Sequence, residues 1–149
     1  AQHPDLLILD EPSGGLDVAV RRRFLDLLLD IANQREITVL IASHILSDVE
    51  RVVDHVAFVK DGCIVSQARL EDLKTQVKRL CLPANARRVD IERRFDVLSY
   101  CEQSDTLLAT VSNFNSERVQ GLDCRVEHLN LEELFLVYNT LGAHERVAS

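Results

Sequence analysis

The sequence lacks any uninterrupted apolar run of the roughly 20 residues that a membrane-spanning helix needs. Its longest apolar stretches, 6–9 and 37–42, have the length of buried strands. The first five residues lack the basic region and the apolar core of a signal peptide. From these absences we expect neither a membrane-spanning helix nor a secretory leader, and a cytoplasmic protein that could dock onto a membrane partner.

An excess of positive charge is also missing, because the formal net charge is -7 over 149 residues. Proteins that bind nucleic acids through phosphate contacts need clustered lysine and arginine, so we expect no nucleic-acid partner. Two short basic clusters, 21–23 and the pair 87–88 with 93–94, are interpreted as solvated faces of helices or strands.

Paired cysteines are absent as well. The four cysteines show no C-x-x-C spacing, which argues against a zinc site or a disulfide frame, and we interpret them as small buried apolar residues: Cys63, Cys81, Cys101 and Cys124.

The first half of the chain alternates strands and helices. A strand at 6–9 ends in two carboxylates, a Pro-Ser-Gly-Gly turn follows, and Asp17 is placed to cap a helix over 18–33. The apolar face of that helix is expected to hold Val20, Phe24, Leu27, Leu28 and Ile31. A second strand at 37–42 precedes a loop with Ser43 and His44. Such alternation predicts parallel pairing in a layered α/β sheet whose strands are buried on both faces.

A short helix near 48–53 is expected after His44, because Ser47 and Glu50 have the spacing of a capping box. Strands at 55–59 and 63–67 flank a Lys-Asp-Gly hairpin signal. An apolar stripe predicts one helix that stops before Pro83: Leu70, Leu73, Val77 and Leu80.

The pattern changes after Pro83. Strands are predicted at 89–95, 107–111 and 124–129, with Tyr100 closing a short helix and the stretch 116–120 unassigned. Asn130 and Glu133 have the spacing that caps a last helix. We therefore predict two parts, an α/β part over 1–83 and a small α+β appendage over 84–149.

Two adjacent acids, Asp10 and Glu11, are the first candidates for chemistry. Ligands of open α/β folds bind at the carboxyl ends of parallel strands, where these acids would lie. Successive side chains on a strand point to opposite faces, so one carboxylate can face a magnesium ion and the other an attacking water. The alternative is that both acids merely end a strand at the surface.

The residues that follow carry a family resemblance. The run 10–17, Asp-Glu-Pro-Ser-Gly-Gly-Leu-Asp, resembles the Walker B motif and D-loop of ABC-type ATPases. The run 41–50, with His44 in the loop, resembles their switch-histidine segment, and 53–62 resembles the strand and turn that come next. Together these motifs cover residues 3 to 82. The resemblance implies a partial P-loop NTPase-type fold with ATP and Mg²⁺ as cofactors.

The resemblance also assigns roles. Asp10 would hold magnesium, largely through water, Glu11 would polarise the attacking water, and His44 would contact the γ-phosphate; all three would thus bind the nucleotide and its metal. The D-loop would contact a second nucleotide-binding domain, most simply in a homodimer of the full-length form, through Ser13, Gly14, Gly15, Leu16 and Asp17. Although Ser13-Gly14-Gly15 looks like the signature motif of the family, it follows the Walker B strand and lacks the next glutamine.

The departure from the family is large. No G-x-x-x-x-G-K-[ST] loop, Q-loop or signature motif occurs in the 149 residues, so we expect a C-terminal segment of a longer protein. The run 130–138 resembles the last helix of ATPase subunits of ABC-2-type exporters, which implies a membrane permease as partner and a peripheral place at the cytoplasmic face of the membrane. A non-transport ABC protein acting on ribosomes or DNA, or a remnant with only a binding role, stays an alternative.

The missing phosphate loop leads to a first prediction. That loop supplies the amide cradle, the lysine and the magnesium-binding hydroxyl of such sites. We expect the purified 149-residue chain to release no phosphate from ATP in a steady-state assay. Robust turnover that Glu11→Gln abolishes would contradict this expectation.

Overall fold

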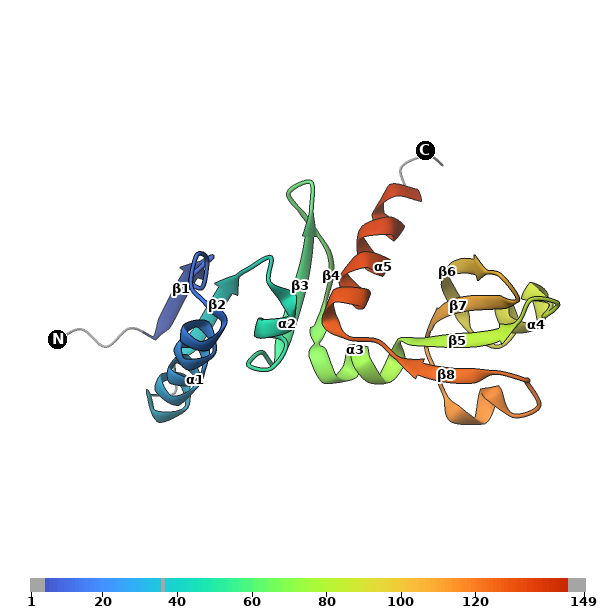
Figure 1. Cartoon of the computed structure of the whole chain (residues 1–149), viewed down its shortest axis with the longest axis horizontal. Coiled ribbons are helices and arrows are strands. Elements are labelled where there is room, and N and C mark those ends of the chain that lie inside the picture. Colours follow the sequence, from blue (N-terminus) through green and yellow to red (C-terminus); the bar gives the residue numbers. More distant parts are fainter. Residues whose placement is uncertain (1–4, 36, 145–149) are drawn as a thin grey trace. The chain divides into compact units, whose positions relative to one another are not determined.

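The computed structural model describes residues 5–35 and 37–144, so the predicted parts 1–83 and 84–149 extend beyond it at 1–4, 36 and 145–149. The chain is mixed α/β and divides into two compact units, 1–53 and 54–149. The elements are, in chain order (Figure 1), β1 (Leu6–Asp10), α1 (Val18–Arg35), β2 (Thr38–Ala42), α2 (Leu46–Val49), β3 (His55–Lys60), β4 (Cys63–Arg69), α3 (Leu70–Gln76), β5 (Lys78–Pro83), α4 (Arg88–Glu92), β6 (Asp96–Gln103), β7 (Thr106–Ser112), the 3₁₀ helix η1 (Ser116–Val119), β8 (Arg125–His128) and α5 (Leu131–His144).

The first unit is a β-α-β crossover. Strands β1 and β2 pair in parallel over their whole length, from Leu6 opposite Thr38 to Asp10 opposite Ala42. Helix α1 connects them, as parallel strands require a long crossover. The Oδ1 atom of Asp17 accepts hydrogen bonds from the backbone N–H groups of Ala19 (2.9 Å) and Val20 (3.0 Å). The predicted helix cap is confirmed, and so is parallel pairing for this pair of strands.

Burial in the first unit differs from the prediction. Along β1 and β2 every second residue is exposed, so neither strand is buried on both faces, and apolar side chains such as Ile8 and Leu40 face solvent. On α1 the buried side chains are Leu25 and Leu28, whereas Val20 and Leu27 are exposed. A two-stranded sheet with a single crossover helix has a second face that nothing covers.

Two predictions for the segment after β2 are wrong. Helix α2 begins at Leu46, before Ser47, and its N-cap residue Ile45 makes no capping bond through its side chain. Ser47 therefore lies inside the helix and starts no capping box. The alternation of strands and helices up to about residue 59 predicts parallel pairing for β3, but β3 pairs in parallel with none of the described strands. It pairs antiparallel with β4, which confirms the predicted hairpin. Their turn residues Asp61 and Gly62 both have positive φ, 49° and 76°, as a two-residue hairpin turn requires.

The helix predicted before Pro83 is confirmed only over its first part, and its continuation to Leu80 is wrong. Helix α3 ends at Gln76, Val77 is extended, and β5 starts at Lys78. The apolar spacing of 70, 73, 77 and 80 fits a helix, but Leu80 and Leu82 are both buried, which is the period of a strand. Strand pairing on both sides of β5 decides the conformation.

The second half of unit 54–149 is a four-stranded antiparallel sheet in the order β6-β7-β5-β8. The strands predicted at 107–111 and 124–129 are confirmed as β7 and β8. The strand predicted at 89–95 is wrong, because this stretch forms the short helix α4 and the chain that follows it. Tyr100 closes no helix and lies within β6. The layered parallel sheet of the prediction is thus limited to β1 and β2.

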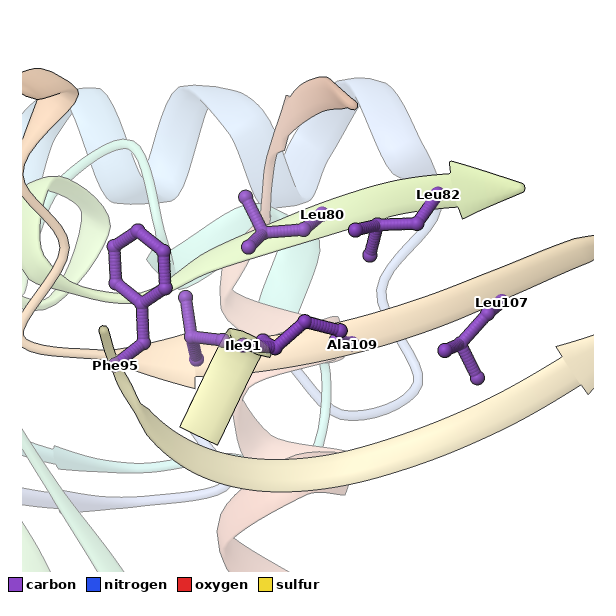
Figure 2. Packing of buried hydrophobic residues seen from close by; sticks show 7 residues of the cluster. Leu80, Leu82, Ile91, Phe95, Leu107 and Ala109 are labelled. Atoms are coloured by element: carbon purple, nitrogen blue, oxygen red, sulfur yellow. The ribbon is translucent and has the colours of Figure 1, made fainter. Parts of the chain in front are cut away.

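Seven buried apolar residues form the core on one face of this sheet: Leu80, Leu82, Ile91, Phe95, Leu107, Ala109 and Val111. Figure 2 shows the leucines of β5 and β7 turned toward Ile91 and Phe95, which come from α4 and the loop after it. Phe95 stacks on Phe114 with 6.0 Å between the ring centroids. The short helix is therefore held by packing, since five residues are too few to be stable alone.

Helix α5 packs against the β3–β4 hairpin. Phe58 of β3 contacts the rings of Phe135 and Tyr138, at 6.0 and 5.2 Å between centroids. The predicted cap of α5 is confirmed: the amide of Glu133 donates to Asn130 (2.9 Å) and the amide of Asn130 donates back to Glu133 (3.1 Å). Burial by itself would raise the pKa of Glu133, but the hydrogen bond that its carboxylate accepts from the Asn130 amide and the Arg79 guanidinium at 2.7 Å lower this pKa below its ordinary value.

Compact packing places the division of the chain at 53/54, whereas the sequence pattern predicts a change of part at 83/84. The division by packing and the change in sequence pattern do not coincide. The reason is that α5 belongs to the predicted appendage 84–149 but packs on the β3–β4 hairpin, which precedes Pro83. The boundary at Pro83 stays a prediction. None of the described helices combines the length and the apolar character that crossing a membrane requires.

The cysteines are all free, but the prediction that they are buried is wrong, because none of the four is fully buried. Cys63 and Cys101 are exposed, and Cys81 and Cys124 are half-buried. Burial raises the pKa of the Cys81 and Cys124 thiols.

Two leucines on α5 provide a matched test of the packing. Leu134 is 0% exposed and Leu136 is 59% exposed. Leu134→Ala should lower the free energy of unfolding by about 2–5 kcal/mol through lost burial and a residual cavity. Leu136→Ala should change it by less than about 0.5 kcal/mol. Urea unfolding of both variants checks this, and equal losses would contradict the packing of α5.

Candidate functional site

The predicted acids lie where β1 ends beside β2. Asp10 is the last residue of β1 and pairs with Ala42. The amide of Glu11 still donates to the carbonyl of Ala42 at 2.8 Å, so the strand ladder extends one residue further. Because the strands are parallel, their carboxyl ends meet, and the loops after Asp10 and after Ala42 start side by side.

Glu11 turns the chain sharply. Its φ is 45°, in the left-handed region that residues other than glycine seldom adopt. The carbonyl of Glu11 accepts a hydrogen bond from the amide of Gly14 at 3.0 Å, which closes the turn. Backbone strain of this kind costs on the order of 1–3 kcal/mol and gathers at functional sites. The turn sends the Glu11 side chain toward the loop that follows β2.

There Glu11 meets His44. Oε1 of Glu11 accepts a hydrogen bond from the His44 amide at 3.0 Å and lies 2.8 Å from Nδ1 of the His44 ring. A ring that donates from Nδ1 keeps Nε2 for a further partner. The side chains are 74% exposed for His44 and 40% for Glu11, so the pair adds little stability but stays open to a ligand. Two of the predicted site residues are thus brought together across 33 residues of sequence.

The donor set around Asp10 suits magnesium only with help from a ligand. Carboxylate oxygens are the hard donors that Mg²⁺ prefers. Within 5–35 and 37–144, however, no three His, Cys, Asp or Glu side chains gather closely enough to hold a metal ion. Mg²⁺ is commonly bound by one or two carboxylates together with substrate phosphates and water, which fits one exposed acid at a strand end.

The loop 13–17 is tightly folded. Ser13 is buried, and its carbonyl accepts from the amide of Leu16 at 3.3 Å. Gly15 has φ +77°, and a Cβ on Gly14 would lie 3.2 Å from the Glu11 carbonyl oxygen. The two glycines are exposed, whereas the Asp17 carboxylate caps α1. The predicted role of this loop in dimer contact stays a prediction.

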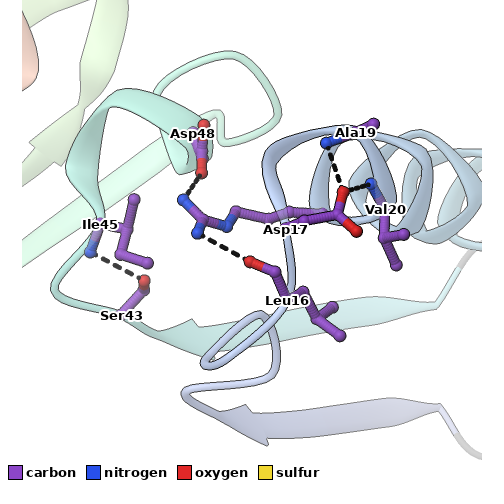
Figure 3. Close-up of polar contacts among 8 residues, drawn as sticks. Leu16, Asp17, Ala19, Val20, Ser43, Ile45 and Asp48 are labelled. Atoms are coloured by element: carbon purple, nitrogen blue, oxygen red, sulfur yellow. Dashed lines mark hydrogen bonds and ion pairs between the residues drawn. The ribbon is translucent and has the colours of Figure 1, made fainter.

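One residue of the site region, Arg21, differs from its prediction. The basic cluster 21–23 predicts a solvated face, but the Arg21 side chain is only 19% exposed and pairs with Asp48 at 2.8 Å. Its second terminal nitrogen donates to the carbonyl of Leu16 at 3.1 Å, as Figure 3 shows. Its Nε is buried without a hydrogen-bond partner among the described residues. The spacing of 27 residues between the ion-pair partners carries no local sequence signal.

Two shallow hollows, of about 400 and 480 Å³, lie in the second unit between α4 and β6. Both are lined by Glu92, Phe95 and Asp96. Neither contains a predicted site residue. The candidate site is an open edge of the first unit, which by itself encloses no nucleotide.

Similar proteins of known family decide the assignment. The bacitracin transport ATP-binding protein BcrA of Bacillus licheniformis is 32% identical over 119 residues, which cover 77% of this chain and 39% of that protein. The ABC transporter ATP-binding protein YtrB of Bacillus subtilis is 36% identical over 76 residues, 51% of this chain and 26% of that protein. The energy-coupling factor transporter ATP-binding protein EcfA2 of Staphylococcus aureus is 34% identical over 80 residues, which cover 54% of this chain and 28% of that protein. No protein-family model matches the chain.

The chain belongs to the ABC-type ATPases. The resemblance seen in the motifs is therefore confirmed at the level of family. The chain spans about two fifths or less of the length of these relatives, so the ABC assignment covers a segment of such proteins.

The conformation of the loop 13–17 leads to a prediction about Gly15. Gly15→Ala places a Cβ in the left-handed region and should destabilise the first unit by about 1–2 kcal/mol. Gly15→Asn should cost less, because asparagine tolerates this conformation. Urea unfolding followed by a probe in residues 5–53 measures both. An alanine variant as stable as the parent would show that the loop relaxes to another conformation.

Proposed function

We propose that this segment supplies the magnesium-and-water side of an ATP site in an ABC transporter ATPase. The observation that carries the proposal is the contact of Glu11 with His44 at the carboxyl ends of two parallel strands. Phosphoryl transfer is catalysed chiefly by positioning and by charge stabilisation, for which an oriented carboxylate and an adjacent imidazole are suited. The names of the similar proteins, all ATP-binding subunits of transporters, support the same function.

In this proposal each side chain has a distinct task. Asp10 holds Mg²⁺, in part through water, and the ion when bound neutralises charge on the phosphates. Glu11 accepts a hydrogen bond from the attacking water and orients it. His44 keeps its Nδ1 on Glu11 and offers Nε2 to a phosphate oxygen, which a protonated ring can reach as a donor. All three act on a nucleotide whose phosphate loop comes from outside these 149 residues, so the segment alone is inactive.

The exposed apolar face of β1 and β2 supports a wider parallel sheet in the longer protein. Leu6, Ile8 and Leu40 face solvent, which is costly for a parallel sheet and unusual in α/β proteins. We propose that further strands and helices of a P-loop NTPase-type core cover this face. The relatives are long enough to contain them, since they exceed the matched stretch more than twofold.

The partners follow from the same assignment. We propose that 13–17 contacts a second nucleotide-binding domain, most simply in a homodimer, and that the protein serves a membrane permease from the cytoplasmic side. Similarity to the bacitracin transport ATP-binding protein over 77% of this chain supports a role in transport, and we propose export of the ABC-2 type. The appendage 84–149 is proposed as an extension specific to that group.

The test uses the longer ABC protein that carries this segment together with a phosphate loop. Glu11→Gln should lower ATP hydrolysis by roughly 10²–10⁴-fold while ATP binding persists, because the amide cannot accept the proton of the attacking water. His44→Ala should lower it by roughly 10²–10³-fold. Phosphate release and nucleotide binding are measured side by side.

The matched control is Glu132→Gln, which changes an exposed acid on α5 by the same chemistry. It should leave turnover within about twofold of the parent. Full turnover in Glu11→Gln would sink the proposed role of that carboxylate.

A further inference from the structure

The two loops that hold Glu11 and His44 are joined at a second point. Arg21 of α1 donates to the carbonyl of Leu16, five residues after Glu11, at 3.1 Å. It also pairs with Asp48, four residues after His44, at 2.8 Å. The loops are therefore connected at their near ends by Glu11 and His44. At their far ends they are connected by one guanidinium, whose bonds to Leu16 and Asp48 are drawn in Figure 3.

The far connection is the better shielded of the two. Arg21 and Asp48 are 19% and 28% exposed, against 74% and 40% for His44 and Glu11. Charge-assisted bonds from a planar guanidinium are strong and directional, and partial burial reduces their screening by salt. An exposed pair such as Glu11 and His44 has little energy with which to fix its own geometry. Its geometry depends on how the two loops are held.

The path from Asp48 to His44 is short and stiff. Asp48 lies in the first turn of α2, where its amide donates to the carbonyl of Ile45 at 3.3 Å. The amide of Ile45 in turn donates to the Ser43 hydroxyl at 3.1 Å. A single turn of hydrogen-bonded backbone therefore connects Asp48 to the residues on either side of His44. The path from Leu16 back to Glu11 is the folded loop 13–16.

We propose that Arg21 and Asp48 are positioning residues for the Glu11–His44 pair. By holding Leu16 and α2 together, the guanidinium sets the distance between the two loops and so keeps His44 on the Glu11 carboxylate. The inference deepens the proposed function, since the pair matters for catalysis only if that function holds.

The experiment measures hydrogen exchange of single amides by NMR in the 149-residue chain. The His44 amide, which donates to Glu11, is the reporter. Arg21→Gln should raise the exchange rate of the His44 amide by about tenfold. The reason is that losing the hydrogen bond to Glu11 removes about a factor of ten in protection against exchange. Arg23→Gln, an exposed arginine on the same helix, is the matched control and should leave the rate unchanged.

A charge exchange provides the rescue. Asp48→Asn alone should also raise the exchange rate of the His44 amide. This variant replaces Arg21→Gln as the test if Arg21→Gln does not fold. Arg21→Asp combined with Asp48→Arg should restore protection at His44 at least in part. Parental exchange at His44 in both single variants would overturn the proposal. So would a uniform rise along α1 and β2, which is the mark of a merely structural role.

The proposed function is tested separately, in the longer ABC protein. There Arg21→Gln should lower kcat by about tenfold with an unchanged KM for ATP, because nucleotide binding is intact and the reacting groups are misplaced. If Glu11→Gln leaves ATP hydrolysis intact, the proposed function fails whatever the exchange data show. If Glu11→Gln is inactive but exchange at His44 ignores Arg21 and Asp48, only the positioning role fails.

Discussion

Parallel pairing of β1 with β2 is the constraint on which the candidate site depends. It places the carboxyl ends of both strands at one edge, and the bond from the Glu11 amide to the Ala42 carbonyl carries the pairing one residue past β1. A shift of one residue would turn Asp10 to the other face and move Glu11 away from His44. Glu11 and Gly15 both have left-handed backbone conformations, which are costly for residues other than glycine. The Glu11 conformation persists because the strand register holds the backbone on both sides of the loop.

The site is built from loops held at their ends. Asp17 fixes the start of α1, Arg21 fixes the loop before that start to α2, and Ser43 stabilises the backbone beside His44. The Glu11–His44 pair itself is exposed and weak in isolation. In the proposed arrangement its rigidity comes from the surrounding contacts, because loops that carry a site are positioned by the scaffold around them.

The second unit has a different physical basis. Its antiparallel sheet and α4 enclose one apolar core, and α5 packs with Phe58 of the hairpin through its aromatic side chains. The capping bonds of Asn130 and Glu133 and the ion pair with Arg79 define where α5 begins. This unit carries none of the predicted catalytic residues.

Local patterns in the sequence were sufficient for features whose causes are local. The caps at Asp17 and Asn130, the Asp61-Gly62 turn and the parallel β-α-β unit depend on neighbouring residues, and all are confirmed. The motifs around Asp10, Glu11 and His44 also indicated the family, because each is a short contiguous run that can be compared directly, and the similar proteins confirm it.

Tertiary structure decided what depends on partners distant in sequence. The helical spacing from Leu70 to Leu80 gave way to strand pairing on both sides of β5, and the segment 89–95 became helical because Ile91 and Phe95 fill a core formed by other strands. The Arg21–Asp48 ion pair had no signal in sequence, since 27 residues separate its members. Spacing along the chain records periodicity, whereas burial and pairing depend on which distant segments come together in space.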